Sequence, residues 1–356
     1  MKIVNIILTS QNGGAEQVFI DYLRILKFQL GHEVLAITKN DAPYADELAR
    51  LDISVKKIKN NFGYYDIFAI NQIKEILQEF NVDAVIAHAG RSMVLVRKAI
   101  KKIKNKKIIE VAVNHSMNVK RSIGADVVIS INRPMFYRTI DCGQDEQKSF
   151  VVPNATDLSD ANFFNPKINW QEKETIIIGC IGRFDKVKGF CFAIKAIKLL
   201  KNYPNKKFKL RLAGRGPYEA YLRGLVKELQ IEDKVEFVGW IGDKKKFFDS
   251  LDIFMLTSQR ETFGLVILEA MKFGKPIISC NAAGPKEILR NEVDGLLIDI
   301  EPSQNVEYRI VEAIERLVND SELTNKMVEN SFFRLKERFS FEALNVRLKE
   351  IFGTKL

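Results

Sequence analysis

The sequence predicts an α/β fold built from two doubly wound domains, each a parallel sheet with helices on both faces. Short β-rich runs alternate with amphipathic helical stretches along almost the whole chain, which indicates βαβ units. The length of 356 residues is more than one hydrophobic core usually serves. Ile-rich runs without alternation, such as Thr175–Ile181, suit strands that are buried on both faces.

The first series of elements predicts a domain over residues 1–155. Its helical patterns cover Ala15–Leu30, Ile67–Phe80 and Ser92–Lys104. Its strand candidates are Lys2–Leu8, His32–Thr38, Ile53–Ile58, Asp83–His88, Lys107–Val113, Val127–Ile131 and Phe150–Val152. A polar segment with two prolines, from Val152 to about Lys173, then predicts the interdomain linker.

The second series predicts a domain over residues 156–338. Its strand candidates are Thr175–Ile181, Lys209–Ala213, Val235–Val238, Ile253–Leu256, Pro276–Cys280 and Gly295–Ile298, and its helices include Phe190–Lys201, Tyr218–Leu229, Leu265–Phe273 and Val306–Val318. The last 50 residues show helical patterns only, and we expect residues 339–356 to form a helix that packs back on the first domain. Ligands of doubly wound sheets bind at the carboxyl ends of the strands, so we expect the chemistry in the cleft between the domains.

The composition indicates a globular protein of the cytoplasm. No apolar run approaches the roughly 20 residues that span a bilayer, and the N-terminus reads as a strand rather than a signal peptide. The four cysteines (Cys142, Cys180, Cys191, Cys280) lack metal-site spacing, and Cys180 and Cys280 are expected to be buried free thiols. The net charge of +10 is densest in residues 1–152, which favours a polyanionic partner such as nucleotide phosphate, anionic lipid or nucleic acid.

A glycine pair follows the first predicted strand, in Asn12-Gly13-Gly14-Ala15-Glu16. Glycines there let the backbone approach a ligand, and the N-terminus of the following helix offers free N–H groups to an anion. An ordinary strand-to-helix turn explains these residues equally well, and they do not form the GxGxxG fingerprint of dinucleotide-binding proteins.

Two further loops of the second domain carry residues suited to a nucleotide sugar. After Thr175–Ile181 comes Gly182-Arg183, followed by Lys188-Gly189, a basic pair able to clamp a diphosphate. After Ile253–Leu256 comes a polar loop with Glu261, Phe263, Gly264 and Leu265, and Glu269 follows within the helix. The helix N-terminus favours a phosphate, and the two carboxylates can accept hydrogen bonds from sugar hydroxyls. The alternatives are surface charge for the basic pair, a helix cap for Glu261 and a solvated side chain for Glu269.

Taken in order along the chain, the motifs closely resemble the retaining glycosyltransferases of family 4, which have the GT-B fold. The resemblance covers nearly the whole chain. It rests on Gly13-Gly14-x-Glu16, Gly31-His32-Glu33-Val34, Val152-Pro153-Asn154, Gly182-Arg183 with Lys188-Gly189, Gly214-x-Gly216-Pro217, Phe237-Val238-Gly239, Glu261-x-Phe263-Gly264 with Glu269-Ala270, Gly274-x-Pro276, Gly284-x-x-Glu287 and Asp294-Gly295.

The resemblance implies a role for each matching residue in the binding of the donor. Arg183 and Lys188 match the basic pair that neutralises the diphosphate of the donor. Glu261 matches the carboxylate that holds the donor sugar, and Glu269 matches the residue that binds the ribose.

The remaining matches are backbone loops and a histidine. Phe263, Gly264 and Leu265 match a loop whose amides reach sugar and phosphate, while Gly13 and Gly14 match the loop that faces the diphosphate. His115 matches the histidine near the transferred sugar. Of the other two histidines, His32 is expected to be structural, and His88 either lines the acceptor pocket or packs in the core.

The function implied is transfer of a hexose from a nucleotide-diphosphate sugar, with UDP favoured over GDP, to a glycan or lipid-linked acceptor. Retention of anomeric configuration and a place in bacterial surface polysaccharide or lipopolysaccharide synthesis are part of the same implication. The chain contains no Asp-x-Asp, so we expect no metal and no other cofactor. The alternatives are a non-enzymatic sugar-nucleotide-binding protein, or a sugar phosphorylase or epimerase on the same fold.

A basic run from Arg97 to Lys107 is the densest cluster of positive charge. A surface helix with a solvated charged face explains it. Peripheral contact with anionic lipid, at the inner face of the cytoplasmic membrane, is a further hypothesis. Nucleic acid fits less well, because the run contains no interleaved aromatic residue and no binding module is recognisable.

Overall fold

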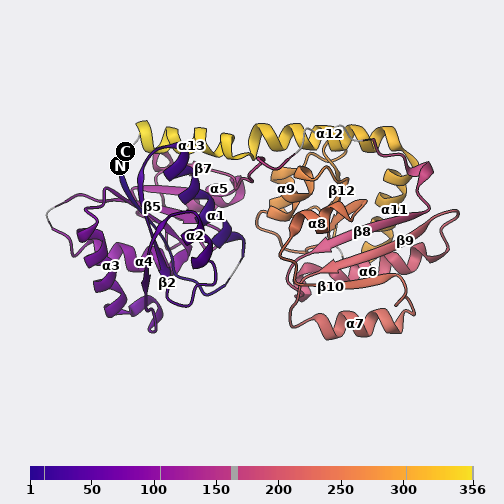
Figure 1. Ribbon diagram of the computed structural model, residues 1–356, viewed down its shortest axis with the longest axis horizontal. Coiled ribbons are helices and arrows are strands. Elements are labelled where there is room, and N and C mark those ends of the chain that lie inside the picture. Colours follow the sequence, from indigo (N-terminus) through magenta and orange to yellow (C-terminus); the bar gives the residue numbers. More distant parts are fainter. Residues whose placement is uncertain (12, 105, 162–166, 302, 355–356) are drawn as a thin grey trace. The chain divides into compact units, whose positions relative to one another are not determined.

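The computed structural model describes residues 1–11, 13–104, 106–161, 167–301 and 303–354. Asn12, Asn105 and residues 162–166 of the predicted linker lie outside the described residues. The chain divides into two compact units, which are Met1–Ala155 with Phe341–Leu356 (unit 1) and Thr156–Ser340 (unit 2). Each unit is built around one parallel sheet (Figure 1).

The sheet of unit 1 has seven strands in the order β3-β2-β1-β4-β5-β6-β7, and all the pairs are parallel. The strands are β1 (Lys2–Ile7), β2 (Glu33–Lys39), β3 (Ser54–Ile58), β4 (Ala84–His88), β5 (Ile109–Asn114), β6 (Val127–Ser130) and β7 (Ser149–Val151). The order reverses between β1 and β4, so the loops that follow these two strands diverge to opposite faces and leave a binding position at their carboxyl ends.

Helices cover both faces of this sheet. They are α1 (Gly14–Arg24), α2 (Ala45–Arg50), α3 (Ile67–Glu79), α4 (Ala89–Ile100), α5 (Arg133–Asp141) and α13 (Phe341–Thr354). On one face, Val4, Ile6 and Leu8 of β1 and the segment after it join a core with Ile70 of α3 and Leu95 of α4. Asn5, which alternates with them, points to the other face and donates a hydrogen bond to the Phe19 carbonyl of α1 at 3.1 Å.

Unit 2 holds a six-stranded parallel sheet in the order β10-β9-β8-β11-β12-β13. Its strands are β8 (Thr175–Ile181), β9 (Lys207–Ala213), β10 (Val235–Gly239), β11 (Ile253–Leu256), β12 (Ile277–Cys280) and β13 (Leu296–Ile298). Its helices are α6 (Phe190–Leu199), α7 (Glu219–Glu228), α8 (Lys244–Asp249), α9 (Leu265–Lys272), α10 (Ala283–Ile288), α11 (Val306–Asn319) and α12 (Ser321–Arg338). The switch point here lies between β8 and β11.

The sequence predicted all thirteen strands of the described residues, and their ends shift by no more than two residues. The helix predicted over Ala15–Leu30 is instead α1 followed by a π-helical turn at Ile25–Gln29. The short helices α2, α5, α8 and α10 were not predicted, because six to nine residues give too little of the helical period to see. All four cysteines are free thiols, with Cys180 and Cys280 buried as expected.

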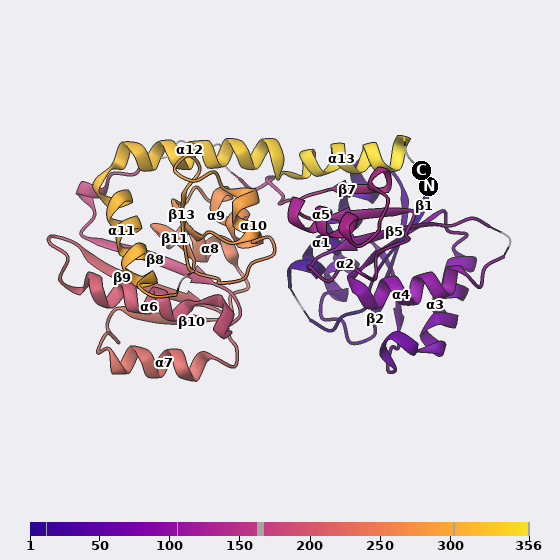
Figure 2. The same ribbon diagram turned by 180° about the vertical axis from the view of Figure 1, so that it is seen from behind.

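Helix α13 packs within unit 1. The Arg24 guanidinium lies 4.9 Å from the centre of the Phe341 ring, and the rings of His32 and Phe352 lie 6.5 Å apart. The end of α13 therefore lies beside the segment that leads into β2, and both views draw it close to the N-terminus (Figures 1 and 2). The first and last residues of unit 2, Thr156 and Ser340, pair in an isolated β-bridge just before this helix.

Two glycines of unit 2 make a matched test of the packing at the β8–β11 switch point. Gly189 has φ of +65°, and a Cβ there would lie 2.1 Å from the Thr257 carbonyl oxygen. Gly224 lies on α7 with nothing within 4 Å of its Cβ position. We expect Gly189→Ala to lower the free energy of unfolding by about 2 kcal/mol or more, and Gly224→Ala to raise it by about 0.5 kcal/mol. Urea unfolding of both variants checks this, and equal effects would contradict it.

Candidate active site

The loops after β8 and β11 in unit 2 are held together at the switch point. The Gln259 amide donates to the Val187 carbonyl at 2.8 Å, and the Thr257 hydroxyl donates to the Lys188 carbonyl at 3.0 Å. The backbone of Gly189 passes against Thr257, which leaves no room for a side chain. The two loops that the sequence singled out in this unit thus form one continuous surface.

Lys188 and Glu261 meet across these loops. The Lys188 ammonium nitrogen lies 2.8 Å from Glu261 Oε2, and the side chains are 28% and 15% exposed respectively. Glu261 does not cap the following helix, since the N-cap is Gly264 and no side chain caps it. A half-buried cation therefore lies in direct contact with a carboxylate at the carboxyl edge of the sheet.

Arg183 has a more open setting. Its guanidinium donates to Asp185 Oδ2 at 2.9 Å, and its side chain is 66% exposed. Asp185 also accepts a hydrogen bond from the Val187 amide and so caps the turn at Lys186–Lys188. Asp185 was not predicted as a site residue, although an Asp two residues before Val187 is a recognisable turn signal.

The segment Phe263–Leu265 presents backbone rather than side chains. The Phe263 ring is buried and lies 6.2 Å from the Phe339 ring. Gly284 passes so close to Phe263 that a Cβ would lie 2.5 Å from its backbone atoms. Gly264 has φ of +101°, a conformation that favours glycine, and α9 starts at Leu265. The Ile267 amide donates to the Gly264 carbonyl at 2.8 Å, and the amides of Leu265 and Val266 precede the repeating hydrogen bonds of the helix, a position that suits an anionic ligand.

Glu269, one turn into α9, is held by a residue that the sequence did not indicate. Its Oε1 lies 2.8 Å from the ammonium nitrogen of Lys244, at the start of α8. The Glu269 side chain is 16% exposed and that of Lys244 is 47% exposed. Glu269 is therefore not a freely solvated helix residue, and each of the two carboxylates has its own lysine.

In unit 1, Glu16 holds Thr9 and Gly13 of the segment that follows β1. Its carboxylate accepts hydrogen bonds from the Thr9 hydroxyl at 2.6 Å and from the Gly13 amide at 3.0 Å. The Gly13 N–H is thus used within the loop, and Gly14 begins α1. Sequence reasoning did not assign Glu16, although the spacing to Gly13 is that of a capping box.

The ends of β4 and β5 bring two histidines together. His88 Nδ1 lies 2.9 Å from His115 Nε2, and the rings are stacked with centres 5.1 Å apart. His88 is completely buried, so it does not itself line a pocket, while His115 is partly buried. Burial lowers the pKa of His115 to about 4, and burial with the nearby His115 lowers the pKa of His88 well below its usual value. Both rings are therefore neutral at pH 7.

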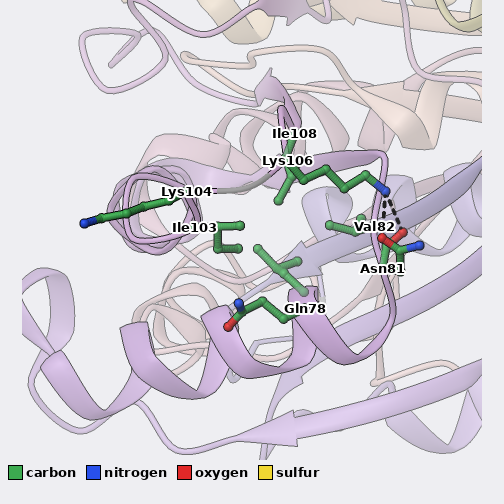
Figure 3. A pocket seen from close by; sticks show the side chains of 8 residues that line it. Gln78, Asn81, Val82, Ile103, Lys104, Lys106 and Ile108 are labelled. Atoms are coloured by element: carbon green, nitrogen blue, oxygen red, sulfur yellow. Dashed lines mark hydrogen bonds between the residues drawn. The ribbon is translucent and has the colours of Figure 1, made fainter.

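A cavity of about 330 Å³ lies near the amino ends of β4 and β5, among residues that precede these two strands (Figure 3). Lys106 bonds there to Asn81 and to Asp83, while Lys104 extends away from the cavity. Other members of the basic run are also used within unit 1, because Arg97 pairs with Glu110 and Lys102 with Asn71. Within unit 1, this cavity is remote from the strand ends that carry His88 and His115.

Two family models match successive parts of the chain. Residues 12–160 match "Glycosyltransferase Family 4", and residues 161–332 match "Glycosyl transferases group 1". The chain belongs to glycosyltransferase family 4. It is a glycosyltransferase of GT-B type, and the two Rossmann-like sheets described above are those of the GT-B fold.

Relatives of this family 4 enzyme match along the full length of the chain. An uncharacterized glycosyltransferase of Haemophilus influenzae is 28% identical over 90% of each chain. The lipopolysaccharide core biosynthesis glycosyltransferase LpsD of Rhizobium meliloti is 26% identical over 99% of this chain and 98% of its own. The crystal structure of Anabaena HepE in complex with UDP has a TM-score of 0.82 at 21% identity, and the match covers 99% of this chain and all of HepE.

The depressed pKa of His115 predicts a pH dependence of stability. The unfolded state binds a proton near pH 6.5 and the folded state only near pH 4, so the stability present above pH 6.5 is lost as the pH falls. We expect the free energy of unfolding to decrease by about 1 kcal/mol between pH 7.0 and 5.5 from this residue. Urea unfolding followed by circular dichroism measures it. The decrease should be smaller in His115→Asn, whereas Lys227→Ala, a change of an exposed lysine on α7, should keep it, and equal slopes in all three proteins would contradict the assignment.

Proposed function

We propose that this protein transfers a hexose from a UDP-sugar to a glycan or lipid-linked acceptor, with retention of anomeric configuration. The observation that supports this best is the contact of Lys188 with Glu261 across the two switch-point loops. It places a cation suited to a diphosphate beside a carboxylate suited to sugar hydroxyls, as glycosyl transfer requires.

In the proposed reaction, the bond between the sugar and the diphosphate breaks and negative charge builds on the leaving diphosphate. Lys188 has three N–H donors, so it can keep Glu261 in place and still donate to a phosphate oxygen. Arg183 is exposed and can turn its guanidinium from Asp185 to the diphosphate. The amides at the start of α9 add a fixed positive potential.

The carboxylates hold the two sugars of the donor. Glu261 accepts hydrogen bonds from hydroxyls of the transferred hexose. Glu269 accepts hydrogen bonds from the ribose hydroxyls, and Lys244 orients the Glu269 carboxylate. Because these cations and amides supply the positive charge, we propose that transfer needs no metal.

Two similar proteins support the donor and the pathway. HepE has been solved with UDP and with UDP-glucose, and LpsD is a lipopolysaccharide core enzyme. We therefore favour UDP over GDP, and place the protein in bacterial surface polysaccharide or lipopolysaccharide synthesis in the cytoplasm. Non-enzymatic binding of a sugar nucleotide, or phosphorylase or epimerase chemistry on this fold, are the alternatives that turnover must exclude.

The donor proposal is tested by thermal-shift measurements with UDP, GDP, ADP and their hexose conjugates, in the presence of EDTA. We expect stabilisation of several degrees by UDP and UDP-sugars in wild type, and its loss in Lys188→Ala. Lys227→Ala, an exposed lysine on α7, is the matched control and should keep the full shift. No shift with any nucleotide would reject the donor proposal, and a shift that appears only with Mg²⁺ or Mn²⁺ would reject metal independence.

Turnover separates the enzyme from a sensor. Release of UDP from the stabilising UDP-sugar, with a glycan or lipid-linked acceptor present, indicates transfer. The anomeric coupling constant of the product, read by NMR, then shows retention or inversion.

We also propose peripheral contact with anionic membrane, but through an aromatic patch rather than the basic run alone. The patch consists of Phe62, Tyr65, Ile67 and Phe68 of unit 1, which are 68%, 81%, 63% and 74% exposed. The Lys98 ammonium lies 4.8 Å from the centre of the Tyr65 ring, so a cation accompanies the apolar side chains. Apolar side chains beside lysines suit the boundary of an anionic bilayer. Among the described residues, no helix is long and apolar enough to cross one.

Vesicle co-sedimentation tests the patch. We expect the full chain to bind vesicles containing phosphatidylglycerol, and Phe62→Ser with Phe68→Ser to weaken binding about tenfold or more, because burying each aromatic side chain is worth about 1.5–3 kcal/mol. Phe333→Ser, on α12 of unit 2 with 56% exposure, is the matched control and should bind as wild type does. Undiminished binding by the double variant would exclude the patch.

A further inference from the structure

The direction of the hydrogen bond between His88 and His115 decides what His115 can offer to a ligand. A neutral imidazole has one nitrogen that donates and one that accepts. The 2.9 Å contact uses Nδ1 of His88 and Nε2 of His115, so each ring has one nitrogen left over. Fixing the donor in this contact therefore fixes the state of both remaining nitrogens.

His88 is enclosed by the protein. It ends β4, and the rings of Phe19 and Tyr22 from α1 pack edge-on against it with centres 5.7 and 5.4 Å away. The titratable groups that face it are Tyr22 and His115, and neither is charged at pH 7. Its Nε2 is buried and has no hydrogen-bond partner among the residues that the structure describes.

The backbone also holds His88 in this orientation. The next residue, Ala89, has φ of +64°, a left-handed conformation that is unfavourable for a residue other than glycine. The sharp turn there allows α4 to start immediately after β4. His88 accordingly points to the α1 face of the sheet, beside Tyr22.

Two arrangements of the protons are chemically consistent. If His88 donates from Nδ1, its buried Nε2 carries only a lone pair and His115 has its proton on Nδ1. If His115 donates from Nε2, His88 must bury an N–H without an acceptor and His115 Nδ1 carries a lone pair. A buried donor without a partner is the costlier defect, so the first arrangement is favoured.

We propose that His88 is a positioning residue that donates from Nδ1 to His115 Nε2 and thereby fixes His115 as a neutral hydrogen-bond donor through Nδ1. His115 then donates to an oxygen of a substrate at the carboxyl ends of β4 and β5, a step that rests on the proposed function, and it does not act as a general base. The tautomers of His88 and His115 do not depend on the identity of the substrate.

The tautomers can be read directly by long-range ¹H–¹⁵N correlation NMR of the full chain labelled in histidine, near pH 7 and without ligand. The chain has only three histidines, and His32→Gln removes the third signal. We expect both His88 and His115 to show the Nδ1–H tautomer. The opposite arrangement gives Nε2–H on both rings and would overturn the proposal, as would a charged imidazolium on either ring.

Three variants test how His88 acts on the reaction. In His88→Leu, we expect His115 to lose its Nδ1–H preference and kcat to fall about tenfold or more, as when a positioned donor is lost. His88→Asn keeps an N–H near the Nδ1 position and should retain most of the activity. In a His115→Ala background, His88→Leu should cost little more, because residues that act together are not additive.

A merely structural role would give a different result. His88→Leu would then lower kcat equally in wild type and in His115→Ala, and Asn would not rescue it. Phe19→Leu, which disturbs the same packing, controls for that effect. If the NMR result holds but no sugar nucleotide binds, the proposed function fails while the tautomer assignment stands.

Discussion

The candidate site depends on the order in which the parallel strands pair. In unit 2, β8 and β11 are neighbours although three α-helices and two strands separate them in sequence. Their carboxyl ends therefore lie side by side, and the Gln259–Val187 hydrogen bond joins the loops that follow. Lys188 and Glu261, 73 residues apart, come into contact only because of this pairing. This contact also requires glycine at positions 189 and 284, since a side chain at either position would push the neighbouring backbone segments apart.

The candidate site residues of unit 2 form ion pairs, whereas the two histidines of unit 1 are neutral. In unit 2, each carboxylate already has a lysine, Glu261 with Lys188 and Glu269 with Lys244. Such pairing limits the rotamers of each carboxylate before any ligand arrives. In unit 1, the histidine pair is neutral and packed among aromatic rings. Burial disfavours the charged form of an imidazole. It strengthens the hydrogen bond that a neutral imidazole donates, because water does not compete for the acceptor.

The sequence was sufficient for the fold and for most of the residues at the strand ends. Buried parallel strands such as Thr175–Ile181 are continuous apolar runs, so their limits can be read without a structure. Arg183, Lys188, Glu261 and Glu269 stand in ordered motifs of the family. The lysine that pairs with Glu269 could not be predicted. Lys244 is one of three consecutive lysines, and the sequence does not distinguish it from the other two. The role of His88 depends on a contact across 27 residues, and either of two interpretations fitted its sequence.

Glu16 shows where local chemistry and ligand binding compete for the same atoms. A glycine pair before a helix suggests amides that are free to meet a phosphate, yet the Gly13 amide already donates to Glu16. The carboxylate also accepts a hydrogen bond from the Thr9 hydroxyl, so one side chain of α1 holds described residues at both ends of this segment. Glycine at position 13 then serves the close approach of Glu16, whose Oε2 would lie 3.2 Å from a Cβ there. A glycine-rich turn is thus evidence of close approach, and only the structure shows that the approaching group is the protein's own carboxylate.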